Sequence, residues 1–249
     1  MAKLVLLDRS DQGVATLSLN RPETRNSVSG VMLDALDDAI NELTADESVR
    51  VAVLTGVGET FCAGADLDEV RGDRTTIHRL LMRLSHVMRK IHRLSIPSIA
   101  RVEGAAIGGG FGLMMVADFA VTHPEAKIGY PPPETGLSPA VTAPYLLRKV
   151  SPGRARAMLL RGGTISGRDA AQMGLVTELV PIAELGEATH RLAMELVKGG
   201  ALATRRMKRL LNALDEPLSD EILDDAARVS ADVVASEETR GRLRHHREG

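Results

Sequence analysis

Two glycine-containing turns in the first half of the chain hold the residues best suited to chemistry. They are Phe61-Cys62-Ala63-Gly64-Ala65-Asp66-Leu67 and Gly104-Ala105-Ala106-Ile107-Gly108-Gly109-Gly110. Small side chains let a ligand approach the backbone, and a helix beginning after the second turn would point free N–H groups and its positive dipole end at that ligand. Two converging N–H groups form an oxyanion hole, which stabilises developing negative charge. The alternative interpretation is that these glycines serve only tight turns and close packing.

The sequence partly matches three familiar motifs, but each match lacks a residue that the chemistry of the motif requires. The dinucleotide pattern Gly-x-Gly-x-x-Gly fails from Gly108 onward because Leu113 stands at its third glycine. The phosphate-binding loop fails because Gly110 stands where its lysine would be. The nucleophile elbow fails in Gly136-Leu137-Ser138-Pro139-Ala140, which ends in alanine instead of glycine. NAD, nucleotide and serine-hydrolase chemistry are therefore not expected.

Metal chemistry lacks a ligand set in the sequence. The histidines include no His-x-x-x-His pair and no zinc-binding signature. The one cysteine, Cys62, allows neither a disulfide framework nor a cysteine-based zinc site. We expect no metal, and a reducing compartment fits this cysteine usage, so the predicted location is cytoplasmic.

Composition and charge disfavour several classes of partner. The chain has 31 Lys and Arg residues against 33 Asp and Glu residues, a formal net charge of -2, which is far from the basic excess of a duplex-binding surface. Aromatic residues make up only 2%, which disfavours a site that stacks bases. No apolar run reaches the roughly 18 residues of a membrane span, and the first residues lack the apolar stretch of a signal peptide. Neither nucleic acid nor a membrane is expected as a partner.

The elements that must position the two turns alternate between strand and helix patterns. This alternation predicts an α/β fold, whose helical C-terminal part begins after about Pro181. The segment Arg240–Arg247 is expected to be a solvated basic tail or a phosphate contact. The predicted strands are Leu4–Leu7 and Val14–Leu19 as a hairpin, Val51–Leu54, Pro97–Val102, Phe119–Thr122 and Leu175–Val180. The predicted helices run to about Leu43 and then cover Ile77–Ile91, Ser166–Gly174, Leu192–Val197, Ala201–Leu214 and Ile222–Val234.

The two turns belong to a longer set of characteristic residues. The other members of the set are Asn20-Arg21-Pro22, Asn26, Gly56, Pro97, Ala117-Asp118, Ala126-Lys127-Ile128-Gly129 and Gly174-Leu175-Val176. As a set, in this order and spacing, these residues resemble the crotonase superfamily, also called the enoyl-CoA hydratase/isomerase family, over most of the chain. The resemblance implies a crotonase-like spiral of ββα repeats with an acyl-CoA site in residues 1–190. It also implies a C-terminal helical region in residues 191–249 that builds a trimer or a dimer of trimers.

The resemblance implies roles for individual residues. The oxyanion donors would be the backbone N–H groups of Ala65 and of Gly109, which would stabilise the enolate of an acyl-CoA thioester. Such donors are typically worth ~10² to 10³ in rate, because a water-poor site screens charge weakly. The expected role of Arg25 is a contact with coenzyme A, and the alternative is that it is simply an exposed loop arginine. No cofactor is implied beyond the coenzyme A moiety of the substrate, which would contact Arg25, Ala63, Asp66 and Leu67.

The sequence departs from the family at its acid–base positions. Typical hydratases place two glutamates around the substrate double bond, one acting on water and the other delivering a proton to the α carbon. The corresponding positions are Gly112 and Pro132, and Ala140 stands at an acidic position that some relatives use. The nearest carboxylate is Glu134, which either reaches the pocket through the proline-rich loop that holds it or faces solvent.

Three functions stay open from the sequence. The first is an enoyl-CoA hydratase/isomerase-type enzyme in which Glu134 moves the proton. The missing glutamate pair suggests two alternatives, a crotonase-fold decarboxylase or thioesterase and a non-catalytic coenzyme A-binding subunit. Tyr130 and Tyr145 are further acids or simply packed rings, and a single tyrosine would suit decarboxylation. The expected partners are an acyl-CoA substrate and further copies of the chain, as a trimer or hexamer.

Overall fold

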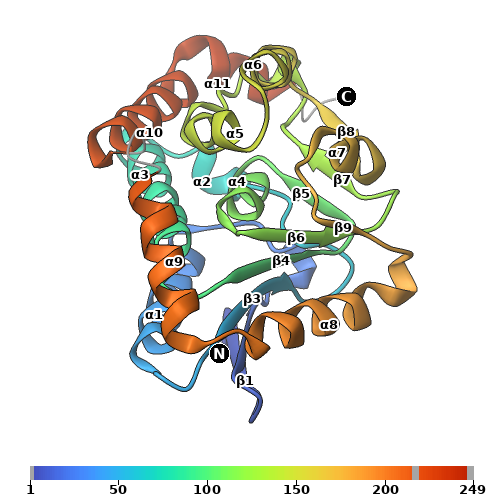
Figure 1. The fold of residues 1–249 in the computed structure, drawn as a ribbon. Coiled ribbons are helices and arrows are strands. Elements are labelled where there is room, and N and C mark those ends of the chain that lie inside the picture. Colours follow the sequence, from blue (N-terminus) through green and yellow to red (C-terminus); the bar gives the residue numbers. More distant parts are fainter. Residues whose placement is uncertain (1–2, 215–218, 246–249) are drawn as a thin grey trace.

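A six-stranded sheet forms the centre of the computed structural model, which describes residues 3–214 and 219–245 (Figure 1). The strands follow the spatial order β1-β2-β3-β4-β6-β9, in which β1 is antiparallel to β2 and every other neighbouring pair is parallel. The strands are β1 (Val5–Arg9), β2 (Val14–Leu19), β3 (Val51–Gly56), β4 (Ser98–Val102), β6 (Phe119–Thr122) and β9 (Glu178–Leu179).

A second, three-stranded sheet lies beside the first and leads to the second glycine turn. Its strands are β5 (Ala105–Ile107), β7 (Lys127–Gly129) and β8 (Thr164–Ser166), with β5 parallel to β7 and β7 antiparallel to β8. A parallel bridge between Cys62 and Ala106 joins the first glycine turn to β5. The two turns are therefore held next to each other by backbone pairing.

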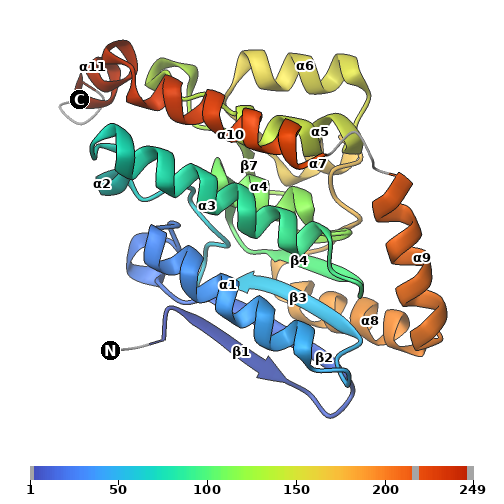
Figure 2. The same ribbon diagram turned by 90° about the vertical axis from the view of Figure 1, so that its left-hand side faces the viewer.

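Helices cover both faces of the six-stranded sheet (Figures 1 and 2). Ala52 and Leu54 of β3 belong to a large core with α1, α3 and α4, whereas Val51 and Val53 pack into a smaller core with α8. The strand predicted over Val51–Leu54 is thus confirmed, and helices cover both of its faces. The helices are α1 (Gly30–Ala45), α2 (Leu67–Val70), α3 (Arg74–His92), α4 (Gly109–Val116), α5 (Ala143–Lys149), α6 (Pro152–Arg161), α7 (Gly167–Met173), α8 (Leu185–Lys198), α9 (Ala201–Leu214), α10 (Asp220–Ala235) and α11 (Glu237–His245), and the 3-10 turns are η1 (Pro22–Thr24), η2 (Pro133–Thr135), η3 (Ala140–Thr142) and η4 (Ile182–Glu184).

Local signals placed several element ends correctly. The hairpin of β1 and β2 is present, and Ser166 caps α7 by accepting a hydrogen bond from Asp169 N–H, while Gly174 ends that helix with φ 85°. The strand predicted over Leu175–Val180 is shorter, because only its β9 part pairs with β6. The division expected between residues 190 and 191 falls within α8, which packs on the sheet.

The C-terminal helices differ in how they are held. Lys208 is the buried residue of α9, and its ammonium group pairs with Asp118. The prediction of a solvated basic tail is partly wrong. Helix α11 extends to His245, and Leu243 is buried because its apolar side chain packs into the large core. Residues 246 and 247 lie outside the described residues. None of the helices in the described ranges is long and apolar enough to cross a membrane.

Asn26 fixes the loop before α1 in the shape that the first glycine turn requires. Its side chain is fully buried, accepts a hydrogen bond from Arg21 N–H (2.9 Å) and donates to the carbonyls of Val57 (3.0 Å) and Thr60 (2.7 Å). Its φ is 54°, and the φ of Arg25 is 53°. Asparagine tolerates this left-handed conformation better than most residues, so one residue supplies both the turn and its bonds.

We expect Asn26→Ala to destabilise the chain by about 3 kcal/mol, because it leaves buried polar groups unpaired and places alanine at positive φ. Equilibrium urea unfolding measures the change. Asn41→Ala, at an exposed position of α1 where one hydrogen bond from Lys90 is lost, is the control and should change stability by less than about 1 kcal/mol. Equal effects of the two substitutions would contradict the role of Asn26.

Candidate active site

The first glycine turn leaves the backbone N–H of Ala65 free. Val28 and Ala65 form a parallel bridge, in which Val28 N–H donates to the Gly64 carbonyl (2.8 Å) and Asp66 N–H donates to the Val28 carbonyl (2.9 Å). In this pattern the residue between the two bonded groups turns its own N–H to the opposite side. Within residues 3–214 and 219–245, the Ala65 N–H has no hydrogen-bond partner.

The second turn leaves the N–H of Gly109 free in the same way. Gly108 ends the turn with φ 54° and donates its own N–H to the Gly129 carbonyl (2.8 Å). Gly109 is the first residue of α4, and the first N–H groups of a helix have no partner inside the helix. No described residue accepts from Gly109 N–H either. The positive end of the α4 dipole therefore lies at this group.

The two free N–H groups lie side by side. A Cβ added at Gly109 would lie 3.8 Å from the Ala65 nitrogen, and a Cβ added at Gly64 would lie 3.7 Å from the Gly109 nitrogen. The latter would also lie 2.9 Å from the Ile107 carbonyl oxygen, and Gly64 has φ +105°, so a side chain there would be strained. Two unpartnered N–H groups this close are suited to an oxyanion hole.

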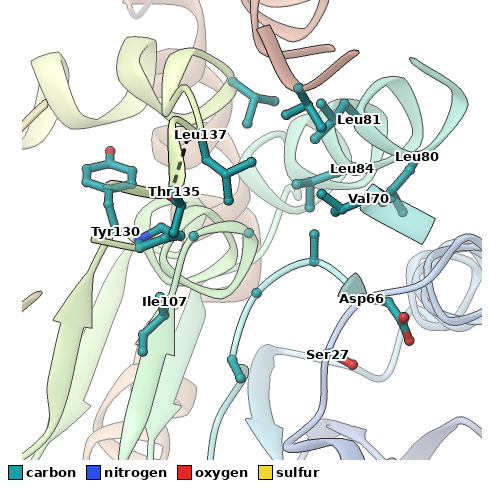
Figure 3. A pocket seen from close by; sticks show the side chains of 18 of the residues that line it. Ser27, Asp66, Val70, Leu80, Leu81, Leu84, Ile107, Tyr130, Thr135 and Leu137 are labelled. Carbon is teal, nitrogen blue, oxygen red and sulfur yellow. Dashed lines mark hydrogen bonds between the residues drawn. The ribbon is translucent and has the colours of Figure 1, made fainter. Parts of the chain in front are cut away.

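Both turns open into a cavity of about 740 Å³, within the size range of small-molecule sites (Figure 3). Figure 3 shows leucines of α3 on one side and Thr135 and Leu137 on the other. The polar and charged lining residues are Arg21, Thr24, Arg25, Ser27, Asp66, Asp68, Arg71, Tyr130, Thr135, Ser138 and Thr142. The aliphatic lining residues are Ala63, Ala65, Val70, Ile77, Leu80, Leu81, Leu84, Ile107, Leu137, Val141, Val234 and Leu243.

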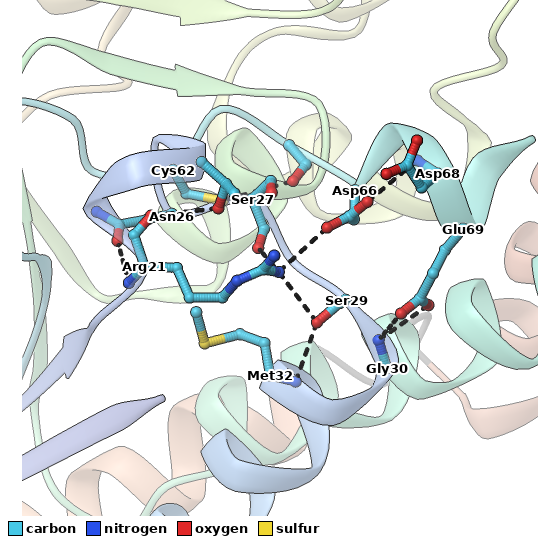
Figure 4. Close-up of polar contacts among 12 residues, drawn as sticks. Arg21, Asn26, Ser27, Ser29, Gly30, Met32, Cys62, Asp66, Asp68 and Glu69 are labelled. Carbon is cyan, nitrogen blue, oxygen red and sulfur yellow. Dashed lines mark hydrogen bonds and ion pairs between the residues drawn. The ribbon is translucent and has the colours of Figure 1, made fainter. Parts of the chain in front are cut away.

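Arg21 holds the first turn against the start of α1 (Figure 4). Its guanidinium group pairs with the Asp66 carboxylate (3.1 Å) and donates to Ser29 Oγ (3.2 Å), the N-cap of α1. The carbonyl of Arg25 accepts the N–H of Ala63 (3.0 Å). Residues on both sides of Ala65 are thus anchored, which leaves the N–H between them no freedom to turn toward another partner.

The residues expected to contact coenzyme A are brought to the cavity in part. Arg25, Ala63 and Asp66 all line it. The Asp66 carboxylate is already engaged by Arg21, so its role is first to shape the turn. Leu67 begins α2, but its side chain lies outside the described residues, as do those of Arg244 and His245. Coenzyme A binding by these residues stays a prediction.

The structure does not bring Glu134 to the cavity. The short helix η2 turns Thr135 inward, where it is buried and lines the cavity, and turns Glu134 outward, where it is exposed. Pro131 and Pro132 line the cavity, but neither can ionise. The placement of Glu134 therefore does not support the prediction that it transfers a proton.

The position expected for a first glutamate is closed by packing. Gly112 is buried in α4, and a Cβ added there would lie 2.7 Å from Thr142 Cγ2 and 2.9 Å from Met88 Sδ. Any larger side chain must displace these neighbours. Thr142 and Met88 fill the space that a glutamate side chain would occupy, so glycine fits at position 112 and glutamate does not.

The two tyrosines are buried and neutral. Tyr130 lines the cavity, and its hydroxyl lies 2.7 Å from Thr142 Oγ1, which itself donates to the Pro139 carbonyl (3.0 Å). Tyr130 therefore donates to Thr142, and burial raises the pKa of its phenol. Tyr145 is not a lining residue; its ring packs edge-on against His92, and burial raises its pKa to about 12.

Sequence reasoning missed part of the cavity lining. Leu80, Leu81 and Leu84 were expected on a helix from their spacing, but spacing does not separate a core leucine from one that faces a cavity. Val234 and Leu243 come from the C-terminal part of the chain, and no local sequence pattern predicts that they line the cavity. Their contribution follows only from how α10 and α11 pack.

Comparison with known proteins shows the family of the chain. A sequence model described as enoyl-CoA hydratase/isomerase matches residues 9–248. A protein of Thermus thermophilus that bears the provisional name enoyl-CoA hydratase is 37% identical over 208 residues, which cover 81% of each chain. The hydroxycinnamoyl-CoA hydratase-lyase of Pseudomonas fluorescens is 33% identical over 80% of this chain and 74% of its own.

Solved structures agree with the sequence comparisons. The crystal structure of an enoyl-CoA hydratase from Mycobacterium smegmatis matches with a TM-score of 0.81 and 35% identity, covering 93% of this chain and 89% of the other. That of an enoyl-CoA hydratase from Mycobacterium avium matches with a TM-score of 0.89 and 29% identity, covering 100% and 97%. The chain belongs to the enoyl-CoA hydratase/isomerase family and has its crotonase fold.

We expect Gly109→Val to lower turnover by about 10² to 10³ while the protein stays folded. Its side chain would begin 3.2 Å from Leu84 Cδ2 and 3.3 Å from Val28 Cγ2, and would displace a substrate oxygen from Ala65 N–H. Steady-state kinetics measures the loss. Gly153→Val, in open space on α6, is the control for the added bulk. Undiminished turnover of Gly109→Val would contradict the proposed oxyanion site.

Proposed function

We propose that this chain, an enzyme of enoyl-CoA hydratase/isomerase type, stabilises the enolate of an acyl-CoA thioester with the N–H groups of Ala65 and Gly109. The observation that carries the proposal is the pair of adjacent, unpartnered N–H groups at the cavity wall. Negative charge that develops on the thioester oxygen would be met by donors already in place, so little reorganisation accompanies the reaction. The aliphatic lining excludes water and so strengthens these interactions.

The coenzyme A moiety is proposed to lie at the charged part of the cavity. Arg25 supplies positive charge there, and the small Ala63 lets a ligand approach the backbone. Asp66 and Leu67 continue the same turn. We propose no cofactor beyond this moiety, because the acyl-CoA brings the group that the donors act on.

Proton transfer separates the possible reactions of this site. Among the described residues that line the cavity, the carboxylates are Asp66, which pairs with Arg21, and Asp68, which is exposed. Hydration or isomerisation needs a group that moves a proton at the substrate carbons. This shortage of carboxylates favours one second candidate, decarboxylation of a 2-carboxyacyl-CoA. Its C–C bond breaks, carbon dioxide leaves, and the electron pair forms the enolate that the two N–H groups hold. A proton from water then adds to the α carbon and gives the acyl-CoA product, so no side-chain base is needed to form the enolate.

Two thioesters distinguish these candidates. Hydration of crotonyl-CoA is followed by the loss of absorbance of the conjugated thioester, and decarboxylation of malonyl-CoA by the appearance of acetyl-CoA. Turnover of crotonyl-CoA supports hydratase chemistry, and turnover of malonyl-CoA alone supports the second candidate. Binding of both without turnover would contradict an enzymatic function and favour a coenzyme A-binding subunit.

We expect Glu134→Gln to leave turnover of the active thioester within about twofold of the unsubstituted protein. Its side chain is exposed and outside the cavity lining, and surface substitutions of this kind change little. The same two assays provide the measurement. A loss of more than about tenfold would instead show that Glu134 enters the cavity during turnover.

Further copies of the chain are proposed to cover α9. This helix buries Lys208 but exposes all five of its large apolar residues, and exposed apolar surface of this kind marks interfaces. Trimers, or hexamers made from two trimers, would bury it. The exposed apolar side chains are Leu202, Met207, Leu210, Leu211 and Leu214.

The double substitution Leu210→Lys with Leu214→Lys should convert a trimer or hexamer to monomers, because it places charges in an apolar interface. Size-exclusion chromatography with light scattering gives the mass. Leu160→Lys, at an exposed position of α6, should leave the assembly intact. A monomeric unsubstituted protein would contradict the assembly.

A further inference from the structure

An apolar stripe of α3 leads away from the proposed oxyanion donors. It begins at Leu84, whose Cδ2 lies 3.2 Å from where a Cβ at Gly109 would stand. It continues through Leu80 to Ile77, and all three leucine and isoleucine side chains are buried and line the cavity. Two helical turns separate Ile77 from Leu84, so the stripe is about 10 Å long. An acyl chain whose carbonyl oxygen is held at Gly109 can follow this stripe.

Helix α11 reaches across the cavity near the N-terminal end of the stripe. Arg240 Nη2 donates to the Gly72 carbonyl (2.7 Å), two residues before α3 begins. Thr239 Oγ1 donates to the Gly136 carbonyl (3.0 Å), directly after η2. The helix is therefore tied to both walls of the cavity. One turn further along, Leu243 is buried and lines the cavity.

Helix α10 packs beside α11 at this end of the cavity. It lies along α3, and Val234 from its last turn also lines the cavity (Figure 2). Arg89 of α3 pairs with Asp224 (2.7 Å), and Arg74 pairs with Asp232 (2.6 Å). The end of the cavity is thus formed by the chain's own C-terminal helices. Leu223, Ala227 and Ala231 of α10 pack into the large core, and the two ion pairs add to this contact with α3.

We propose that Leu243 determines the length of the acyl chain that fills the cavity. This inference rests on the proposed function, since it assumes an acyl-CoA held at the two N–H groups. The stripe on α3 and the residues at its end, Val234 and Leu243, offer an acyl chain only hydrocarbon contacts. Each methylene group buried there raises the affinity for the acyl-CoA about fourfold. Arg71 also lines the cavity, so an acyl group with a terminal carboxylate is the competing ligand.

Isothermal titration calorimetry with saturated acyl-CoAs, from acetyl-CoA to dodecanoyl-CoA, tests the selection without catalysis. The affinity of the full chain should rise about fourfold per methylene and then level off. Leu243→Ala should move the levelling point to longer chains, and Leu243→Phe should move it to shorter ones. Acetyl-CoA affinity should stay within about twofold in both variants. Leu160→Ala, exposed on α6, is the matched control, and thermal unfolding confirms that each variant is folded.

The outcomes separate this inference from the function on which it rests. An unchanged levelling point in both Leu243 variants overturns the inference while acyl-CoA binding stands. Tighter binding of succinyl-CoA than of butyryl-CoA also overturns it, in favour of Arg71 as the selecting residue. Binding of none of the thioesters, acetyl-CoA included, overturns both the inference and the proposed function.

Discussion

The parallel bridge between Val28 and Ala65 is the contact on which the candidate site depends. A hydrogen bond adds about 0.5–1.5 kcal/mol of net stability, so a free turn would rearrange to pair the half-buried N–H of Ala65. The bridge prevents this, because it uses the backbone groups of Gly64 and Asp66 and leaves Ala65 facing the cavity. Arg21 and Asn26 in turn hold the loop that carries Val28. Much of the loop's polar bonding thus serves to keep one N–H unpaired.

The surroundings of the two donors suit an enolate more than a charged side chain. Aliphatic residues weaken screening, so a fixed pair of N–H groups interacts strongly with developing charge. The same surroundings would make an unpaired carboxylate costly, and Thr142 with Met88 fills the space beside Gly112. The buried hydroxyl of Tyr130 stays protonated and bound to Thr142. Stabilisation of charge by the backbone is therefore the strongest chemical capability of this cavity.

The sequence predicted those features that local chemistry determines. Alternation and short apolar runs identified the strands of the main sheet, and capping residues such as Ser166 and Gly174 marked the ends of α7. Positive φ explains why Gly64 and Gly108 are glycines. The outward turn of Glu134 and the return of Leu243 to the cavity depend on packing between segments far apart in the chain. No local pattern contains that information, so these two features required the structure.

The C=O stretching band of a bound thioester is the most direct measure of hydrogen bonding by the two N–H groups. Infrared difference spectroscopy of a saturated acyl-CoA with ¹³C at the carbonyl isolates its stretching band on the protein. Hydrogen bonds from Ala65 and Gly109 weaken the C=O bond, so the band should move to lower frequency than in water and return toward its free position in Gly109→Val. A bound thioester whose band is unshifted in the unsubstituted protein would contradict the oxyanion site.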